Sequence, residues 1–299
     1  MNWMKSLLVW VSLLVCSGVF AQENPLWMRY PSISPDGKTI AFCYKGDIFL
    51  VDAEGGRATQ LTTHPAYDYH PVWSPDGKTI AFTSGRDGGM DLYTVPVTGG
   101  TPTRLTTFSG KAVPTCFTPD GKHILFNASI LPEKEFDRFP TAGQLYSVKV
   151  EGGRPELVLS FNAYDVAYTP DGKKMLYHDW KGYEDEWRKH HTSSVCRDIW
   201  MHDLEQGTFK NLTDKQVEDR NPVISADGST VYFLSERFGS FNVCRMSLNQ
   251  PQDIRQVTKF TKHPVRFLSR SNDDVLCFFY DGEIYTMKPD GEPKKVAVS

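Results

Sequence analysis

Short runs of apolar and β-branched residues alternate with polar turns along most of this chain, beginning near residue 31. The second run of the pattern is the clearest, with Ser74-Pro75-Asp76-Gly77-Lys78 before one β-rich stretch and Gly99-Gly100 before another. Pro presets the turn backbone, Asp bonds neighbouring amides, and Gly accepts a positive φ. A Gly pair also suits a tight turn between antiparallel strands. The strands of this unit are predicted at residues 71–73, 79–83, 91–95 and 103–106.

This unit occurs six times. The turn sequence Ser34-Pro35-Asp36-Gly37-Lys38 recurs in three close copies. It is matched less closely at residues 225–229 and is hardly recognisable at residues 271–274. The turn Asp or its expected equivalent stands at positions 36, 76, 120, 171, 227 and 272. Four strands in each repeat of roughly 40–50 residues are typical of propeller blades. The sequence therefore predicts an all-β protein, a six-bladed β-propeller of four-stranded antiparallel blades over residues 22–299.

The closure of the ring can also be predicted from the phase of the repeats. Every copy runs from its first strand to its fourth, and residues 26–30 are all that precede the first copy in the predicted propeller. No spare strand is left to complete a blade from the far end of the chain. We therefore expect the ring to close mainly by packing of side chains, without a blade that both ends share.

The N-terminal segment has the pattern of an export signal. Lys5 precedes an apolar run at residues 7–15, and Ala21 ends a stretch of small or modest residues. This predicts a signal peptide over residues 1–21, cleaved after Ala21, and a periplasmic protein. An acylated Cys16 is the alternative, although the preceding Val15 is larger than the residue that lipoprotein signals place there. The apolar run is too short for a good membrane span, so we expect none after cleavage.

Composition narrows the classes of partner and cofactor. The formal net charge is −3 and no basic run stands out, so nucleic acid is not an expected partner. Five cysteines remain beyond Cys16, with no C-x-x-C pair, which favours buried thiols over a disulfide framework or a zinc site. One bridging pair is left open. We expect no metal and no cofactor, and interpret the Asp residues of the turns as turn formers rather than calcium ligands.

Two repeats carry insertions between their second and third strands, at residues 130–140 and 180–191. Insertions in repeat proteins fall on the loops of one face and often form the binding surface. The second insertion combines three aromatic residues with several charges and the pair His190-His191. It is a candidate binding element, or alternatively a loop whose aromatic side chains cover the edge of a blade.

No catalytic motif appears in the chain. A G-x-S-x-G elbow, an H-E-x-x-H helix, a P-loop and a dinucleotide glycine fingerprint are all missing from the sequence. His190 and His191 are adjacent and lack a third ligand, so loop histidines are favoured over a metal pair. Neither Ser193-Ser194 nor the carboxylates of Glu184 and Glu186 has an assignable catalytic partner. The residues alone indicate no reaction.

The repeated turns resemble the TolB-type, WD-like propeller repeats of exported bacterial proteins. Three stretches, residues 104–111, residues 180–183 with 197–200, and residues 207–212, together resemble the N-terminal six-bladed propeller of tricorn-type serine proteases. This resemblance covers about residues 26–298, and Trp180-Lys181-Gly182-Tyr183 is its most specific element. In that family a second propeller, a PDZ module and the protease core follow this domain, and the propellers are thought to guide peptides toward the catalytic chamber.

The resemblance implies a non-catalytic propeller that binds or channels peptides or docks protease modules. The sequence stops after the sixth repeat, so the resemblance supplies no catalytic residue and leaves it uncertain whether the chain belongs to an enzyme. The candidate peptide- or partner-binding residues are Lys111, Trp180, Lys181, Tyr183 and Trp187. A stand-alone TolB-like periplasmic scaffold, with other envelope proteins as partners, is the alternative. An enzyme that uses the central funnel of the propeller is a third and less favoured hypothesis.

Overall fold

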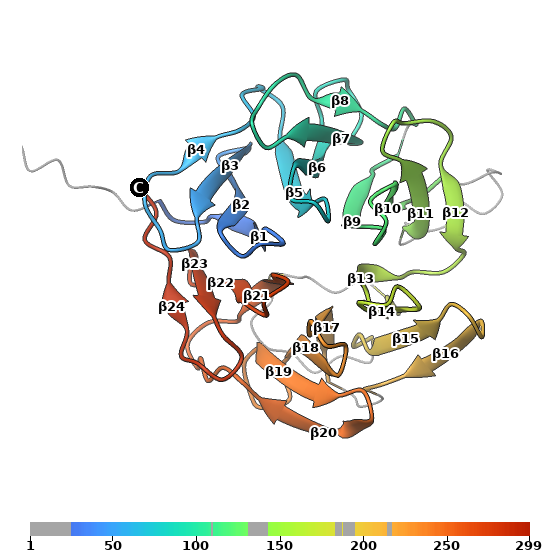
Figure 1. Ribbon diagram of the computed structural model, residues 1–299, viewed down its shortest axis with the longest axis vertical. Coiled ribbons are helices and arrows are strands. Elements are labelled where there is room, and N and C mark those ends of the chain that lie inside the picture. The colour runs from blue at the N-terminus through green and yellow to red at the C-terminus, as the bar shows by residue number, and fades with distance from the viewer. Residues whose placement is uncertain (1–24, 109, 131–142, 183–186, 188–194, 214–216) are drawn as a thin grey trace, which may run out of the picture.

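A computed structural model of the chain describes residues 25–108, 110–130, 143–182, 187, 195–213 and 217–299. Within these residues it contains six four-stranded antiparallel sheets, arranged as blades around a central axis (Figure 1). Each sheet is built from four strands that are consecutive in the sequence. The predicted six-bladed, all-β propeller is therefore confirmed. No helix long and apolar enough for a membrane crossing occurs in the described residues.

The strands, blade by blade from the inside outward, are β1 (Arg29–Ile33), β2 (Thr39–Tyr44), β3 (Asp47–Asp52) and β4 (Thr59–Gln60); β5 (Asp68–Trp73), β6 (Thr79–Ser84), β7 (Asp91–Pro96) and β8 (Thr103–Arg104); β9 (Val113–Phe117), β10 (His123–Ala128), β11 (Gln144–Lys149) and β12 (Glu156–Leu159); β13 (Tyr164–Tyr168), β14 (Lys174–His178), β15 (Ile199–Asp203) and β16 (Thr208–Asn211); β17 (Asp219–Ile224), β18 (Thr230–Ser235), β19 (Asn242–Ser247) and β20 (Gln250–Gln256); and β21 (Arg266–Arg270), β22 (Leu276–Tyr280), β23 (Glu283–Met287) and β24 (Lys294–Lys295).

Because neighbouring strands are antiparallel, the propeller has two different faces. The turns between the first and second strands and between the third and fourth strands lie on one face, which we name the turn face. The connections between the second and third strands, and from each blade to the next, lie on the opposite face, which we name the loop face. The strands that precede the two predicted insertions, β10 and β14, end at the loop face, and every innermost strand begins there.

The repeated turn is held by its own side chains. In the second blade, Ser74 Oγ donates to Asp76 Oδ1 at 2.6 Å, and the amide of Lys78 donates to the same oxygen at 3.1 Å. The amide of Thr79 in turn donates to Ser74 Oγ at 2.9 Å. Gly77 has a φ of 69°, which explains the glycine at this position. The turn Asp is therefore a structural residue, as the sequence indicated.

The sixth turn corrects one assignment. Counting from the sequence placed Asn272 at the position of the turn Asp, but Ser271 Oγ donates to Asp273, and the amide of Val275 donates back to Ser271 Oγ at 3.0 Å. This turn is one residue shorter than the others, and Asp274 takes the left-handed conformation, with a φ of 61°. Because this turn is one residue shorter, the position of the turn Asp inferred from the repeat was Asn272 instead of Asp273.

The Leu-Thr and Val-Thr pairs at the outer edge also differ from the prediction. They were expected inside fourth strands, but Thr62, Thr106, Thr213 and Thr258 follow those strands. Their hydroxyls accept hydrogen bonds from third-strand amides, for example from Ile48 at 3.0 Å and from Leu92 at 2.9 Å. A side-chain oxygen replaces the ladder carbonyl at these positions, so the fourth strands end earlier than their sequences suggested.

The core consists of apolar layers between blades. Each of the six clusters of buried residues lies at one of the six contacts between neighbouring blades. Strand β2 shows how one strand contributes to two layers: Ile40 and Phe42 face the sixth blade, while Ala41 and Cys43 face the second. Such a strand is buried on both faces, because alternate side chains point to opposite sides of the sheet. No blade can hide its apolar surface without both neighbours.

The seam between the sixth and first blades uses more than side-chain packing. No strand is shared between blades among the described residues, as expected. Backbone hydrogen bonds nevertheless cross the seam, from Gly56 to the carbonyl of Ala297 at 2.7 Å, from Ser299 to that of Gly56 at 3.0 Å, and from Trp27 to that of Gly282 at 2.7 Å. The sequence predicted closure mainly by packing of side chains, and these backbone hydrogen bonds add to it. They were not expected, because their donors and acceptors lie in turns and terminal residues rather than in predicted strands.

Gly55 offers a test of this seam. It has a φ of 101°, and a Cβ atom there would lie 2.7 Å from the carbonyl oxygen of Ala297. The matched control is Gly99, in the same turn of the second blade, with a φ of 86° and no atom within 4 Å of an added Cβ. We expect Gly99→Ala to lower the free energy of unfolding by about 1–2 kcal/mol through backbone strain. Gly55→Ala should lose about 1–2 kcal/mol more, because it also displaces seam hydrogen bonds.

Urea denaturation followed by tryptophan fluorescence measures both losses. Equal losses for Gly55→Ala and Gly99→Ala would show that the C-terminal residues do not contribute to closure.

Candidate functional site

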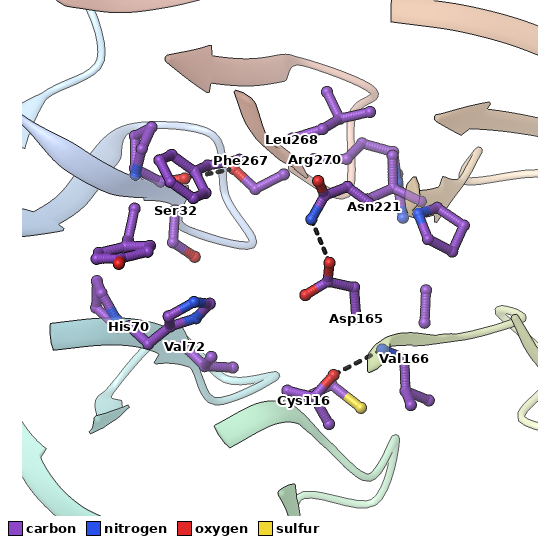
Figure 2. Close-up of a pocket in the computed structure, with 18 of the residues that line it drawn as sticks. Ser32, His70, Val72, Cys116, Asp165, Val166, Asn221, Phe267, Leu268 and Arg270 are labelled. Atoms are coloured by element: carbon purple, nitrogen blue, oxygen red, sulfur yellow. Dashed lines mark hydrogen bonds between the residues drawn. The ribbon is translucent and has the colours of Figure 1, made fainter. Parts of the chain in front are cut away.

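The innermost strands of all six blades converge on the propeller axis (Figure 1). Residues of these strands line a cavity of about 270 Å³, most of whose lining residues are drawn in Figure 2. Adjacent inner strands are joined to one another by hydrogen bonds. The amide of Ile33 donates to Ser269 Oγ at 3.2 Å, and the amide of Val166 donates to Thr115 Oγ1 at 2.6 Å. The strands that line the cavity therefore also help to hold neighbouring blades together.

Five of the six inner strands carry one residue in the left-handed backbone region near the loop face. These residues, with φ values between 49° and 58°, are Tyr30, His70, Asp165, Asn221 and Phe267, and we name them the mouth ring. The ladder to the second strand shifts register at each of them, which is the signature of a β-bulge. In the third blade Pro114 occupies this position, and its ring requires a negative φ. All five members of the mouth ring line the cavity.

A bulge of this kind re-aims a side chain, and here the effect is repeated around the axis. Asp and Asn tolerate a positive φ best among non-glycine residues, whereas aromatic residues such as Tyr30 and Phe267 are strained there and persist only where the surrounding structure enforces it. The paired strands on either side and the adjacent blades supply that enforcement. The mouth ring is thus a set of side chains that the fold positions against local backbone preference.

One half of the mouth ring is aromatic. The ring centroid of Tyr30 lies 4.3 Å from that of His70 and 4.5 Å from that of Phe267, so the contacts run continuously from the sixth blade to the second. Burial and the nearby charge of Lys111 lower the pKa of His70 to about 4. The imidazole is therefore neutral at physiological pH and behaves as an aromatic ring rather than a cation.

The facing half is polar. Asn221 Nδ2 donates a hydrogen bond to Asp165 Oδ2, and Figure 2 shows the two side chains pointing toward one another. Behind them, His178 Nδ1 lies 3.4 Å from the same carboxylate oxygen. Burial, together with the charges of Arg197 and Arg220, lowers the pKa of His178 well below its usual value, so this imidazole is also neutral. The amide and carboxylate groups of this half can bond to main-chain groups of a ligand.

Deeper in the cavity, the side chains become small in every blade. Two residues beyond the mouth-ring position, the wall is formed by Ser32, Val72, Cys116, Ala167, Val223 and Ser269. Burial raises the pKa of the Cys116 thiol, so it is not a reactive nucleophile. All five described cysteines are free, and the bridging pair left open by the sequence is not formed. No group of three or more His, Cys, Asp or Glu side chains suited to a metal occurs in the described residues.

Four of the five candidates predicted from the sequence are described, and these four lie on the loop face with different contacts. Exposed Lys111 places its Nζ 5.2 Å from the ring centroid of Tyr69, beside the aromatic half of the mouth ring. Trp180 packs 5.5 Å from Tyr164, and the guanidinium of Arg197 lies 4.6 Å from its ring. Trp180 therefore contributes to packing behind the polar half. Tyr183 lies outside the described residues.

Lys181 is tied into the protein. Its Nζ forms an ion pair with Asp198, donates to the carbonyl of Cys196 at 2.8 Å and lies 3.6 Å from Asp179. The carboxylate of Asp198 is largely buried, with 8 % of its side chain exposed. These contacts tie Lys181 to the end of β14 and to the residues just before β15.

Trp187 reaches across the propeller. It belongs to the insertion of the fourth blade, yet its indole lies 4.8 Å from the guanidinium of Arg29 and 5.1 Å from that of Arg266. Phe267 packs against it edge-on at 5.6 Å, and Arg266 Nη2 donates to its carbonyl at 2.7 Å. The residue therefore extends the aromatic half of the mouth ring at the seam between the sixth and first blades.

Sequence reasoning missed the mouth ring. Its members lie four residues before the Ser or Thr of each turn, and three of them precede a proline, as in Tyr30-Pro31, His70-Pro71 and Asn221-Pro222. This recurring offset was the available signal. The side-chain types differ from blade to blade, so no sequence motif identified this position.

The sequence profile of the tricorn protease N-terminal β-propeller domain matches residues 25–293. The chain belongs to this family. The resemblance that the inserted Trp-Lys-Gly-Tyr segment indicated is therefore confirmed.

Solved structures agree on the fold of this tricorn-family propeller. A crystal structure of the tricorn protease superposes with a TM-score of 0.75 at 23 % identity, over 91 % of this chain and 26 % of that one. TolB from Acinetobacter baumannii superposes with a TM-score of 0.64 at 20 % identity, over 97 % and 70 % of the two chains. An uncharacterized protein of Agrobacterium fabrum is 29 % identical over 147 residues, which is 47 % of this chain and 44 % of the relative. The chain thus spans less than half of that relative and about a quarter of the tricorn protease.

The different roles of the two lysines can be tested. Lys181→Met should lower the free energy of unfolding by about 1–3 kcal/mol, because it leaves a largely buried carboxylate without its cation. Lys111→Met is the matched control and should change stability by less than about 0.5 kcal/mol, as is usual for an exposed side chain. Chemical denaturation of the two variants provides the comparison. If Lys181→Met were as stable as the wild-type protein, the contacts of Lys181 would not stabilise the fold.

Proposed function

We propose that this tricorn-family propeller is a non-catalytic module that binds extended peptides at the loop-face mouth of its central cavity. The observation that carries the proposal is the mouth ring, in which five residues held in the left-handed conformation turn their side chains to one opening. Residues in this sparsely populated conformation that converge on a cavity are more typical of binding sites than of packing. Family membership supports a place within a peptidase system, where the module would deliver peptides or dock protease modules.

The proposed module is an exported one. The N-terminal pattern with Lys5 and Ala21 predicts cleavage of a signal peptide, and these positions lie outside the described residues. A single N-terminal sequencing or mass measurement of the mature protein distinguishes cleavage after Ala21 from acylation at Cys16.

Peptide binding can be measured by fluorescence polarisation with labelled, unstructured peptides and the purified chain from residue 22 onward. We expect saturable binding that Asn221→Gly weakens about fivefold, because one hydrogen bond to the ligand is worth roughly 1 kcal/mol. Glycine keeps the positive φ of 51° without strain, so the variant should retain the backbone at this position. The control is Phe209→Ser on the outer strand of the fourth blade, where the side chain is 43 % exposed and far from the axis.

Binding that is absent, or that both variants weaken equally, would contradict the proposed site. We expect no hydrolysis of the bound peptides, and turnover that persists through rigorous purification would overturn the non-catalytic assignment. Pull-downs that recover envelope proteins without a protease subunit, combined with absent peptide binding, would favour the stand-alone TolB-like scaffold.

A further inference from the structure

We infer that the cavity is a pocket for a single aromatic side chain of the bound peptide. This inference rests on the proposed peptide-binding function and names the ligand class of the same site. It differs from a channel through which an extended chain passes, because it gives the rim and the wall of the cavity separate roles.

The rim is the mouth ring, and its aromatic half selects the ligand. Tyr30, His70 and Phe267 form a continuous arc with centroid separations of 4.3 Å and 4.5 Å. Each of these side chains is only partly buried, so ring surface remains open toward the cavity. Offset and edge-to-face contacts between aromatic rings stabilise a complex beyond the burial of area.

The wall leaves room for the side chain. Small residues stand below the rim in all six blades, among them Ser32, Ala167 and Ser269. The cavity of about 270 Å³ is slightly smaller than small-molecule pockets, which span roughly 300–1,000 Å³. That volume suits one large side chain rather than a length of polypeptide.

The cavity also has an end toward the turn face. Tyr168, Ile224 and Arg270 line this end, one residue beyond the small wall positions. Arg270 is already engaged, since its Nη1 donates to the carbonyl of Ser271 at 2.5 Å and to Asp274 Oδ1 at 2.9 Å. A guanidinium held in this way does not call for an acidic side chain at the turn-face end of the pocket.

The chain itself shows that the rim accepts an indole. Trp187 packs against Phe267 and lies between the guanidinium groups of Arg29 and Arg266. Opposite this arc, Asp165 and Asn221 carry carboxylate and amide groups, which can bond to the main chain of a peptide. A peptide would therefore place an aromatic ring on one half of the rim and its backbone on the other.

The test uses a set of labelled peptides that differ at one central residue, which is Phe, Leu, Ala or Glu. We expect the full chain from residue 22 onward to bind the Phe peptide about tenfold more tightly than the Ala peptide, the sum of two aromatic contacts. The Glu peptide should bind no better than the Ala peptide.

Asparagine variants remove the rings and keep the backbone, because Asn tolerates the left-handed region. His70→Asn and Phe267→Asn should each reduce the Phe-to-Ala preference to about threefold or less. The matched control is Lys45→Asn, at an exposed left-handed residue with a φ of 51° outside the cavity, which should keep the full preference. Thermal unfolding of each variant verifies its fold. If an Asn variant does not fold, the Gly variant at the same position replaces it, because Gly accepts the positive φ.

Two results would overturn the inference while the proposed function stands: peptides that bind with no preference for Phe, or a preference that survives in both His70→Asn and Phe267→Asn. If none of the four peptides binds, the proposed function fails and this inference fails with it.

Discussion

The burial of apolar surface between neighbouring blades is the constraint on which this protein depends. Alternate residues of each middle strand enter two different layers, as Ile40 and Ala41 do on either side of the first blade. A four-stranded blade with two apolar faces is not stable alone, so the layers have to continue around a closed ring. The backbone hydrogen bonds of Gly56, Ala58 and Ser299 complete the seam where the first and sixth blades meet.

The same constraint produces the site. Six sheets that converge on one axis bring their innermost strands close together, and hydrogen bonds such as that from Val166 to Thr115 tie these strands to their neighbours. Bulges near the loop face then turn one side chain per strand toward the opening in five blades. Because the ring enforces the strained backbone, the residue types at those positions are free to differ. An aromatic half and a polar half can therefore coexist in a repeated framework.

The sequence was sufficient for features that depend on local chemistry. The Ser-Pro-Asp-Gly turns, the strand order and the number of blades follow from residues close together in the chain, as the bonds of Asp76 illustrate. It was insufficient where partners are distant. Lys181 has the composition of a binding residue, but its ion pair with Asp198, 17 positions away, could not be read from the sequence. The mouth ring was hidden because its members share a backbone conformation rather than a side-chain type.

Native-state hydrogen exchange, read at the second strands β2, β6, β10, β14, β18 and β22, tests the closed ring most directly. If each blade depends on both neighbours, the amides of the first and last blades are as protected as those of the blades between them. Markedly faster exchange in β2 and β22 than in the other four strands would show that the ends of the chain open independently, and would contradict this account of the fold and its central site.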